Sequence, residues 1–533
     1  MKRILSHNKL AFAAVVLLAA QLSGCAQPQS DATPGKSDQT LVSVAGGQLK
    51  GYQQQDIVVF KGIPYAAPPV GENRWRAPQP SSWQGVKDAT SFGNDCMQKP
   101  FPSDAAPLGE TPAEDCLYLN IWAPEDASNT PVVIWIHGGG YVNGGASPKV
   151  YDGSEFAKND VMFVSFNYRL GRFGFFAHPA LRNDNGKGIA NFAFMDQIAA
   201  LKWVRENIAA FGGNPDKITV MGESAGGGSV HTLMQADESK HLFDAAIVMS
   251  GGGRSLMGER HLSKSTDGQP SAEQIGLNFA ASNNISGTSE AALDALRQLP
   301  AEVVLDGLSM MSFMVPRNGP PTYVGGPITE GDIVQGTTEE MLLAGKVANM
   351  PVMVGTTGQD IGFMQKKSKQ EVFAMFGEEA DKAQSVYDPD GNTDFQLVNY
   401  SVGQDFGMQE PARFFATKMT AAGEPVYLYR FNYVADEVND GRGAHHASEI
   451  PFFFKTIDDK YEHLTETDWQ ASEYPFQYVV NFVKSGSPNG ADLPQWQPFD
   501  PDEDKIMIFT ANGNAEYVTD PWRSRLDLVE SAY

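Results

Sequence analysis

Six short apolar runs, separated by longer polar or helical segments, constrain the fold of this chain most strongly. Apolar runs of this length are typical of parallel strands that are covered by helices on both faces. Between the second and third runs, apolar residues recur at helical spacing from Ile198 to Ile208, and a Gly-Gly pair at 212–213 ends the pattern. The chain is therefore predicted to form an α/β fold with a central, mostly parallel β-sheet flanked by helices on both faces. The six runs are PVVIWI (131–136), VMFVSF (161–166), ITVM (218–221), AAIVM (245–249), PVMV (351–354) and VYLYRF (426–431).

The third run leads directly into GESAGG (222–227), which has the pattern of a nucleophilic serine on a sharp strand-to-helix turn. Such a turn is strained, so it requires small residues two positions before and two positions after the serine. It also places Ser224 at a helix N-terminus, where the backbone dipole favours negative charge. We predict that Ser224 is the nucleophile and that its neighbour Glu223 supports it.

The first run leads into a second glycine-rich segment, HGGGY (137–141). Glycine lets the backbone approach a ligand closely and turn its N–H groups towards it. The N–H groups of Gly139 and Gly140, with that of Ala225 after the nucleophile, are predicted to form an oxyanion hole. Such donors typically lower a barrier by about 3 kcal/mol each. A flexible turn, the alternative, explains one glycine but not three in succession.

A serine hydroxyl needs a neighbouring base to take its proton, and on this kind of fold an acid and a histidine follow the serine in the chain. His231 lies seven residues further along the same predicted helix, roughly 10 Å away, so it cannot reach the hydroxyl. The adjacent His445 and His446 lie in a loop after the sixth run, where a catalytic base is expected. The residues alone do not decide between these two. The candidates that remain are His241, His261, His445, His446 and His463.

The first 40 residues are expected to lie outside the folded domain. A basic start and an apolar run at 10–22, too short to span a bilayer, predict an export signal at 1–24. The sequence LSGC (22–25) resembles the bacterial lipoprotein signal, which implies that Cys25 is lipidated; a plain secretory signal is the alternative. Residues 25–40 are polar and predict a flexible tether. The protein is thus expected to be exported and lipid-anchored to the bacterial cell envelope, or secreted.

If Cys25 carries lipid, Cys96 and Cys116 remain as a pair in an oxidising compartment. A disulfide is then the expected state, and two free buried thiols are the alternative. The loop that it closes, about twenty residues long, corresponds to roughly 3 kcal/mol of stability in the chain-entropy model.

Charge and missing motifs exclude several classes of partner. The formal net charge of −24 repels a phosphate backbone, so no nucleic-acid partner is expected. The chain lacks an HExxH motif, clustered Cys/His spacing, a Walker lysine and a Rossmann glycine pattern, so no metal or nucleotide cofactor is expected. Contact with a membrane is expected only through the N-terminal lipid anchor.

From about residue 41 to the C-terminus, the sequence resembles the type-B carboxylesterase and cholinesterase family of α/β-hydrolases. The resemblance implies a single α/β-hydrolase domain over 41–533 and a small-molecule ester substrate. It also implies a serine carboxylesterase mechanism with an acyl-enzyme intermediate. The matching blocks are FKGIPYA (60–66), EDCLYLNI (114–121), HGGGY (137–141), NYRLG (167–171), FGGNP (211–215) and GESAGG (222–227).

The same resemblance implies roles for residues that the patterns alone leave open. The histidine loop of the family, Gly-Ala-x-His-x-x-Glu, matches 443–449 and implies that His446 is the base. In GTTGQDIGF (355–363), Asp360 stands where the family has the glutamate of the triad, one methylene shorter; another acid is the alternative. Ser250 matches a serine that supports the triad in relatives, or it is a simple turn residue. The family also has an early disulfide at the positions of Cys96 and Cys116.

Two other functions are compatible with such a fold. One is a non-catalytic binding module, as in cholinesterase-like adhesion proteins, which typically lack the serine or the histidine. This chain keeps both. The other is an acyltransferase, in which an alcohol instead of water accepts the acyl group.

Overall fold

The computed structural model describes residues 39–101, 106–183, 185–254, 260–266, 268–313, 319–331, 333–362 and 364–533. Gln39–Tyr533 forms one compact unit. The predicted signal (1–24), Cys25 and the tether up to residue 38 lie outside the described residues, so these boundaries stay predictions. Among the described residues, no helix combines the length and the apolar character needed to cross a membrane.

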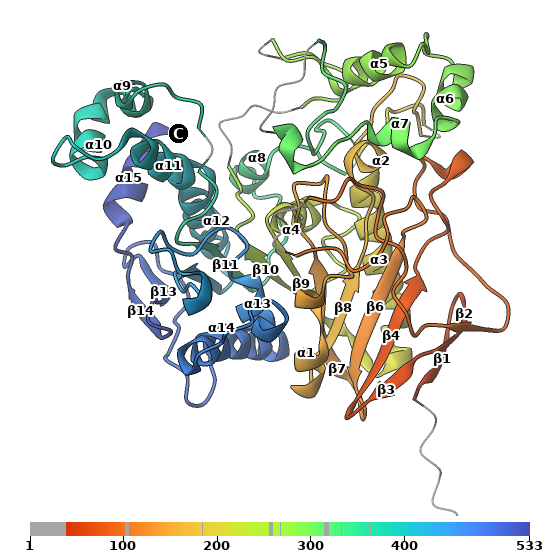
Figure 1. The fold of residues 1–533 in the computed structure, drawn as a ribbon, viewed down its shortest axis with the longest axis horizontal. Coiled ribbons are helices and arrows are strands. Elements are labelled where there is room, and N and C mark those ends of the chain that lie inside the picture. The colour runs from red at the N-terminus through yellow and green to blue at the C-terminus, as the bar shows by residue number, and fades with distance from the viewer. Residues whose placement is uncertain are drawn as a thin grey trace, which may run out of the picture. The chain divides into compact units, whose positions relative to one another are not determined.

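A mixed sheet, with eleven strands in the described residues, forms the centre of this unit (Figure 1). Its strands are β3 (Tyr52–Gln54), β4 (Ile57–Pro64), β6 (Tyr118–Pro124), β7 (Thr130–Ile136), β8 (Met162–Phe166), β9 (Gly213–Glu223), β10 (Ala245–Met249), β11 (Val352–Thr357), β12 (Val426–Phe431), β13 (Lys505–Phe509) and β14 (Ala515–Thr519). The spatial order is β14-β13-β12-β11-β10-β9-β7-β8-β6-β4-β3. The strands from β8 to β13 in this order run parallel. All six predicted apolar runs overlap central strands, which confirms the α/β prediction.

The described residues also form a smaller sheet, fifteen α-helices and several short 3₁₀ or π turns. The sheet contains β1 (Leu41–Val44), β2 (Gly47–Lys50) and β5 (Val86–Asp88). The helices are α1 (Ser154–Lys158), α2 (Gly171–Gly174), α3 (Phe192–Asn207), α4 (Ala225–Gln235), α5 (Ala272–Ser282), α6 (Glu290–Arg297), α7 (Ala301–Leu305), α8 (Thr338–Leu343), α9 (Lys369–Phe373), α10 (Ala380–Tyr387), α11 (Phe395–Gln404), α12 (Glu410–Ala421), α13 (Ile450–Phe454), α14 (Glu466–Ser485) and α15 (Arg523–Ala532).

Alternate residues of the central strands face two different hydrophobic cores. On β7, Val132 and Ile134 pack into a core that includes residues of α3, α4 and α12. Their neighbours Val133 and Trp135 pack into a second core with residues of α1, α13 and α14. A strand that alternates in this way buries both of its faces, and each fully buried large apolar side chain stabilises the fold by about 1.5–3 kcal/mol. The predicted covering of the sheet on both faces is therefore confirmed.

The predicted disulfide is present. Cys96 and Cys116 are bonded to each other, and their Cα atoms lie 4.9 Å apart. Both residues are buried. The bond joins two points of the segment between β5 and β6, and Cys116 lies two residues before β6.

The register of the parallel strands brings five chain segments to the same edge of the sheet. Ile136 at the end of β7 is level with Gly222 near the end of β9. Met249, the last residue of β10, is level with both Glu223 and Gly355. β11 and β12 end together at Thr357 and Phe431. Ligand sites of open α/β sheets lie at this edge. The segments that follow these strands contain residues that were singled out in the sequence, among them Ser224, Asp360 and His446.

Candidate active site

Ser224 occupies a strained turn between β9 and α4. Its backbone has φ 56° and ψ −121°, a conformation that costs roughly 1–3 kcal/mol for a residue with a side chain. A Cβ on Gly226 would lie 2.0 Å from the carbonyl oxygen of Ile136, so only glycine fits there. Hydrogen bonds hold the turn on both sides, from Ser224 N to Met249 O (2.9 Å) and from Gly228 N to Ser224 O (2.8 Å). The geometry thus accounts for the small residues around the serine.

The glycine-rich loop after β7 lies against this turn. A Cβ on Gly138 would come within 3.1 Å of Ser224 Cβ. Gly139 and Gly140 both have positive φ, at 100° and 60°, and within the described chain their N–H groups donate to no acceptor. Ala225 is the first residue of α4, so its N–H has no acceptor inside the helix. Three uncommitted amide donors therefore lie on the two segments that meet at Ser224.

Asp360 and His446 are joined directly, in the loops after β11 and β12. His446 Nδ1 donates to Asp360 Oδ1 at 2.6 Å. The Asp360 side chain is fully buried and also accepts from Ser250 Oγ (2.6 Å), Thr357 N (3.1 Å) and Ile361 N (2.8 Å). Burial by itself raises the pKa of Asp360. The charge of His446 and the hydrogen bonds from His446, Ser250 and Ile361 outweigh burial and lower the pKa below its ordinary value.

The other nitrogen of His446 faces Glu223. Nε2 lies 3.2 Å from Glu223 Oε1, and among the described residues it makes no hydrogen bond, so it is not joined to Ser224 Oγ. Burial lowers the pKa of His446. The carboxylates of Glu223, Asp360 and Glu449 and the hydrogen bond to Asp360 raise it more strongly, to about 10. The imidazolium form is therefore strongly stabilised in this arrangement.

Glu449, for which the sequence predicted no role, is a buried acid close enough to His446 for their charges to interact. Neither of its carboxyl oxygens has a hydrogen-bond partner in the described part of the chain. Burial, followed by the nearby charges of Glu223 and Asp360, raises its pKa well above the ordinary value. Its position three residues after His446, within the family-like loop pattern, was the available signal.

Three other histidines that follow Ser224 in the sequence have different surroundings. His445 is exposed, and its nearest carboxylate is that of Asp440, at 4.0 Å. His231 is buried against Phe415, with ring centroids 4.4 Å apart. His261 contacts Thr329 and Glu330. Of the histidines left open by the residues alone, His446 is the one joined to Asp360.

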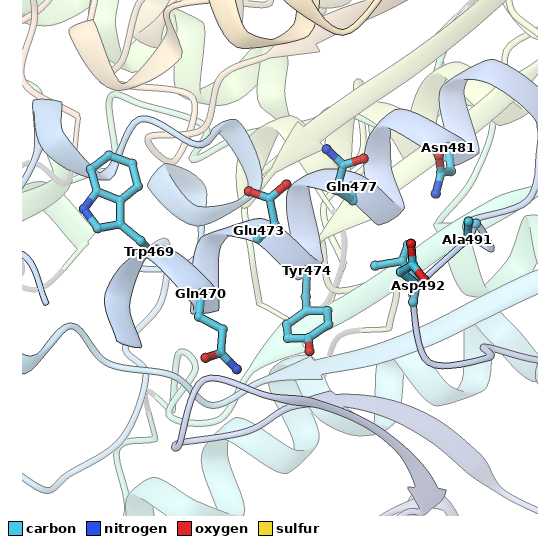
Figure 2. Close-up of a pocket in the computed structure, with 10 residues that line it drawn as sticks. Trp469, Gln470, Glu473, Tyr474, Gln477, Asn481, Ala491 and Asp492 are labelled. Carbon is cyan, nitrogen blue, oxygen red and sulfur yellow. The ribbon is translucent and has the colours of Figure 1, made fainter. Parts of the chain in front are cut away.

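A large hollow lies away from these loops. Its volume is about 740 Å³, and its lining includes Trp469, Glu473 and Gln477 of α14 and Asp492 of the loop that follows (Figure 2). None of its lining residues belongs to the strand ends around Ser224.

Among the described residues, no group of three or more His, Cys, Asp or Glu side chains could hold a metal ion.

Comparison with known proteins gives a consistent result along most of the chain. The model of the carboxylesterase family matches residues 38–521. Para-nitrobenzyl esterase of Bacillus subtilis (strain 168) is 33% identical over 485 residues, which cover 88% of this chain and 94% of that protein. Cocaine esterase of Homo sapiens is 31% identical, with 90% and 89% of the two chains covered. A solved structure of PNB esterase superposes with a TM-score of 0.76 at 30% identity and covers 93% of this chain and 99% of its own.

Proposed function

Because the chain belongs to the carboxylesterase family and is a carboxylic ester hydrolase, we propose that it acts through an acyl-enzyme formed on Ser224. Its substrate is a small-molecule ester. The observation that carries the mechanism is the meeting of three features at one edge of the sheet. These are the strained turn of Ser224, the uncommitted amides of Gly139 and Gly140, and the bonded pair of Asp360 and His446.

In the proposed first step, Ser224 Oγ attacks the ester carbonyl carbon while His446 Nε2 takes the hydroxyl proton. Asp360, bonded to Nδ1, holds the ring in orientation and stabilises the imidazolium. The N–H groups of Gly139, Gly140 and Ala225 donate to the oxyanion of the tetrahedral intermediate, and each contributes about 3 kcal/mol. Ser250 holds the second oxygen of Asp360 and so fixes the acid.

The intermediate then collapses, and the imidazolium gives its proton to the leaving alcohol oxygen. Water attacks the acyl group on Ser224, with His446 again taking the proton, and the second collapse releases the acid and restores the serine hydroxyl. For the first proton transfer, Nε2 exchanges its contact with Glu223 for one with Ser224. Catalytic hydrogen bonds commonly tighten in this way only when substrate is bound. Glu223 supports the site by stabilising the protonated imidazole between transfers.

The direct test is Ser224→Ala, assayed on short-chain p-nitrophenyl esters. The variant is expected to keep its circular dichroism spectrum and melting temperature and to lose hydrolysis. Ser385→Ala, an exposed serine on α10, is the matched control and is expected to hydrolyse at the wild-type rate. Equal activity of Ser224→Ala and wild type contradicts the mechanism. Product analysis with an added alcohol identifies whether water or the alcohol accepts the acyl group.

We also propose that the protein is exported and anchored to the cell envelope through lipid on Cys25. The basic and apolar start of the chain and the LSGC sequence support this, and so does the Cys96–Cys116 disulfide, because disulfides persist in oxidising compartments. In a bacterial host grown with a labelled fatty acid, the wild-type protein is expected to carry label and to sediment with membranes. Cys25→Ser is expected to lose both properties. Label or sedimentation that persists in Cys25→Ser contradicts the anchor.

A further inference from the structure

A π-helical turn, η6 (Asp405–Gln409), lies between α11 and α12 and next to the loop of Asp360. The N–H of Glu410 bonds to the carbonyl of Asp405, five residues earlier, which is the bond that defines such a turn. A π-turn amounts to one extra residue inserted into an α-helix. Such insertions are rare and occur frequently at functional sites.

Side chains from this continuous helical element bind the backbone on either side of Asp360. Tyr400 OH donates to the carbonyl oxygen of Asp360 (2.5 Å), and Gln404 Oε1 accepts from the Asp360 N–H (3.0 Å). Gln409 Nε2 donates to the carbonyl of Thr357 (2.7 Å). Gln409 Oε1 also accepts from Thr356 Oγ1 at 2.6 Å. The backbone of Asp360 and the carbonyl of Thr357, at the end of β11, are therefore both held by side chains of one helical element.

The inserted residue explains how these side chains share a face. At roughly 100° per residue in an α-helix, Gln404 lies about 40° from Tyr400, whereas Gln409, nine residues on, would lie about 180° away. With one residue taken up by the π-turn, Gln409 takes the position of an eighth residue, about 80° from Tyr400. An uninterrupted α-helix would turn the amide of Gln409 away from Thr357.

The opposite side of the turn is fixed by other parts of the chain. Asp405 is fully buried and accepts from Arg525 through two hydrogen bonds of 2.8 Å and from Tyr387 OH at 2.6 Å. Tyr533 OH donates to the carbonyl of Phe406 at 2.5 Å. These contacts join η6 to α10, to α15 and to the C-terminal residue (Figure 1). The π-turn is thus a fixed support with contacts on both sides.

We propose that Gln404 and Gln409 are positioning residues that fix the Asp360 backbone through this π-turn. The side chain of Asp360 is one methylene shorter than the glutamate that the family resemblance implies. A carboxylate on a shorter arm reaches the imidazole only if its backbone is held close. The bonds from Gln404 and Gln409 hold it where Oδ1 meets His446 Nδ1 at 2.6 Å. This inference rests on the proposed function of Asp360 and His446.

The test compares Gln409→Met and Gln404→Met with Gln396→Met, an exposed glutamine of the same helix. Rates are measured on p-nitrophenyl acetate per active site, titrated with an organophosphate, so that unfolded protein is not counted. Both support variants are expected to lose at least about tenfold in kcat with KM within twofold, because misplacing a catalytic group by about 1 Å costs up to a hundredfold. The acidic limb of kcat is expected to move to lower pH, because a weaker hydrogen bond from His446 to Asp360 stabilises the imidazolium less.

If Gln404 and Gln409 only stabilised the fold, their replacement would lower the stability of the protein without moving the acidic limb of kcat. The inference is overturned if, per active site, both variants keep the kcat and the pH profile of Gln396→Met. Gln404→Met removes a single hydrogen bond and provides the test if Gln409→Met does not fold. Activity in Ser224→Ala refutes the proposed function itself. An inactive Ser224→Ala beside fully active glutamine variants refutes the positioning role alone.

Discussion

Replacing Glu223 by glutamine removes the charge closest to Nε2 of His446, the nitrogen that is proposed to take the serine proton. The carboxylate lies 3.2 Å from Nε2. Burial lowers the pKa of His446, and Glu223 is the first of the carboxylates that reverse this effect and raise the pKa to about 10. Glutamine keeps the size of the side chain and its hydrogen-bonding oxygen but carries no charge.

The size of the effect follows from the separation. Two unit charges about 4 Å apart at an effective dielectric constant of about 20 interact by about 4 kcal/mol. That energy corresponds to about 3 pKa units and is an upper bound. Asp360 stays bonded to Nδ1, so we expect the pKa of His446 to fall by about 1–3 units. Because the base is active when unprotonated, a lower pKa moves the acidic limb of kcat/KM to lower pH.

The assay is the pH profile of kcat/KM on p-nitrophenyl acetate, since this parameter reports the pKa values of the free enzyme. Wild type and Glu223→Gln are compared with Glu206→Gln, which removes an exposed carboxylate from α3. The control is expected to follow the wild-type profile. If the acidic limb of kcat/KM stays in place in Glu223→Gln, or moves to higher pH, the carboxylate of Glu223 does not raise the pKa of His446 and the reasoning is refuted.

Three further changes test other parts of the structure. Asp360→Asn is expected to lower kcat by about 10³–10⁴ with little change in KM, because the imidazole loses its orienting acceptor; steady-state kinetics that match wild type would show that another acid serves. Cys96→Ser combined with Cys116→Ser is expected to lower the free energy of unfolding by about 3 kcal/mol in a urea titration, and an unchanged midpoint contradicts this. Asp196→Asn leaves the guanidinium of Arg169, whose side chain is 3% exposed, without its anion. A loss of about 3–5 kcal/mol is expected, and a loss below 1 kcal/mol would show that the ion pair is dispensable.

The sequence predicted the centre of the fold because buried parallel strands need apolar residues on both faces. The runs at 245–249 and 426–431 coincide with β10 and β12. The run at 218–221 is shorter than β9, which begins at Gly213. Residues 215–217 of that strand are Pro-Asp-Lys and are not buried, so hydrophobicity alone gives no signal for them.

The site was predictable only where chemistry leaves a local pattern. The turn of Ser224 and the glycines after β7 have such patterns, because strained backbone and close approach restrict the residue types. The choice of His446 over His445 came from family resemblance, and its contact with Glu223 depends on how a loop meets the end of β9, far away in the sequence. Gln404 and Gln409 have no local signal, since the backbone atoms that they bind lie 44 and 52 residues away in the sequence.

The central claim is that an acyl group is carried by Ser224, and covalent labelling tests it most directly. The protein is treated with a fluorophosphonate ester, digested and analysed by mass spectrometry while residual hydrolysis is followed. One adduct per chain is expected on the peptide that contains Ser224, in proportion to the activity lost, and none in Ser224→Ala. Activity that disappears while Ser224 stays unlabelled, or with the adduct on another residue, contradicts the account.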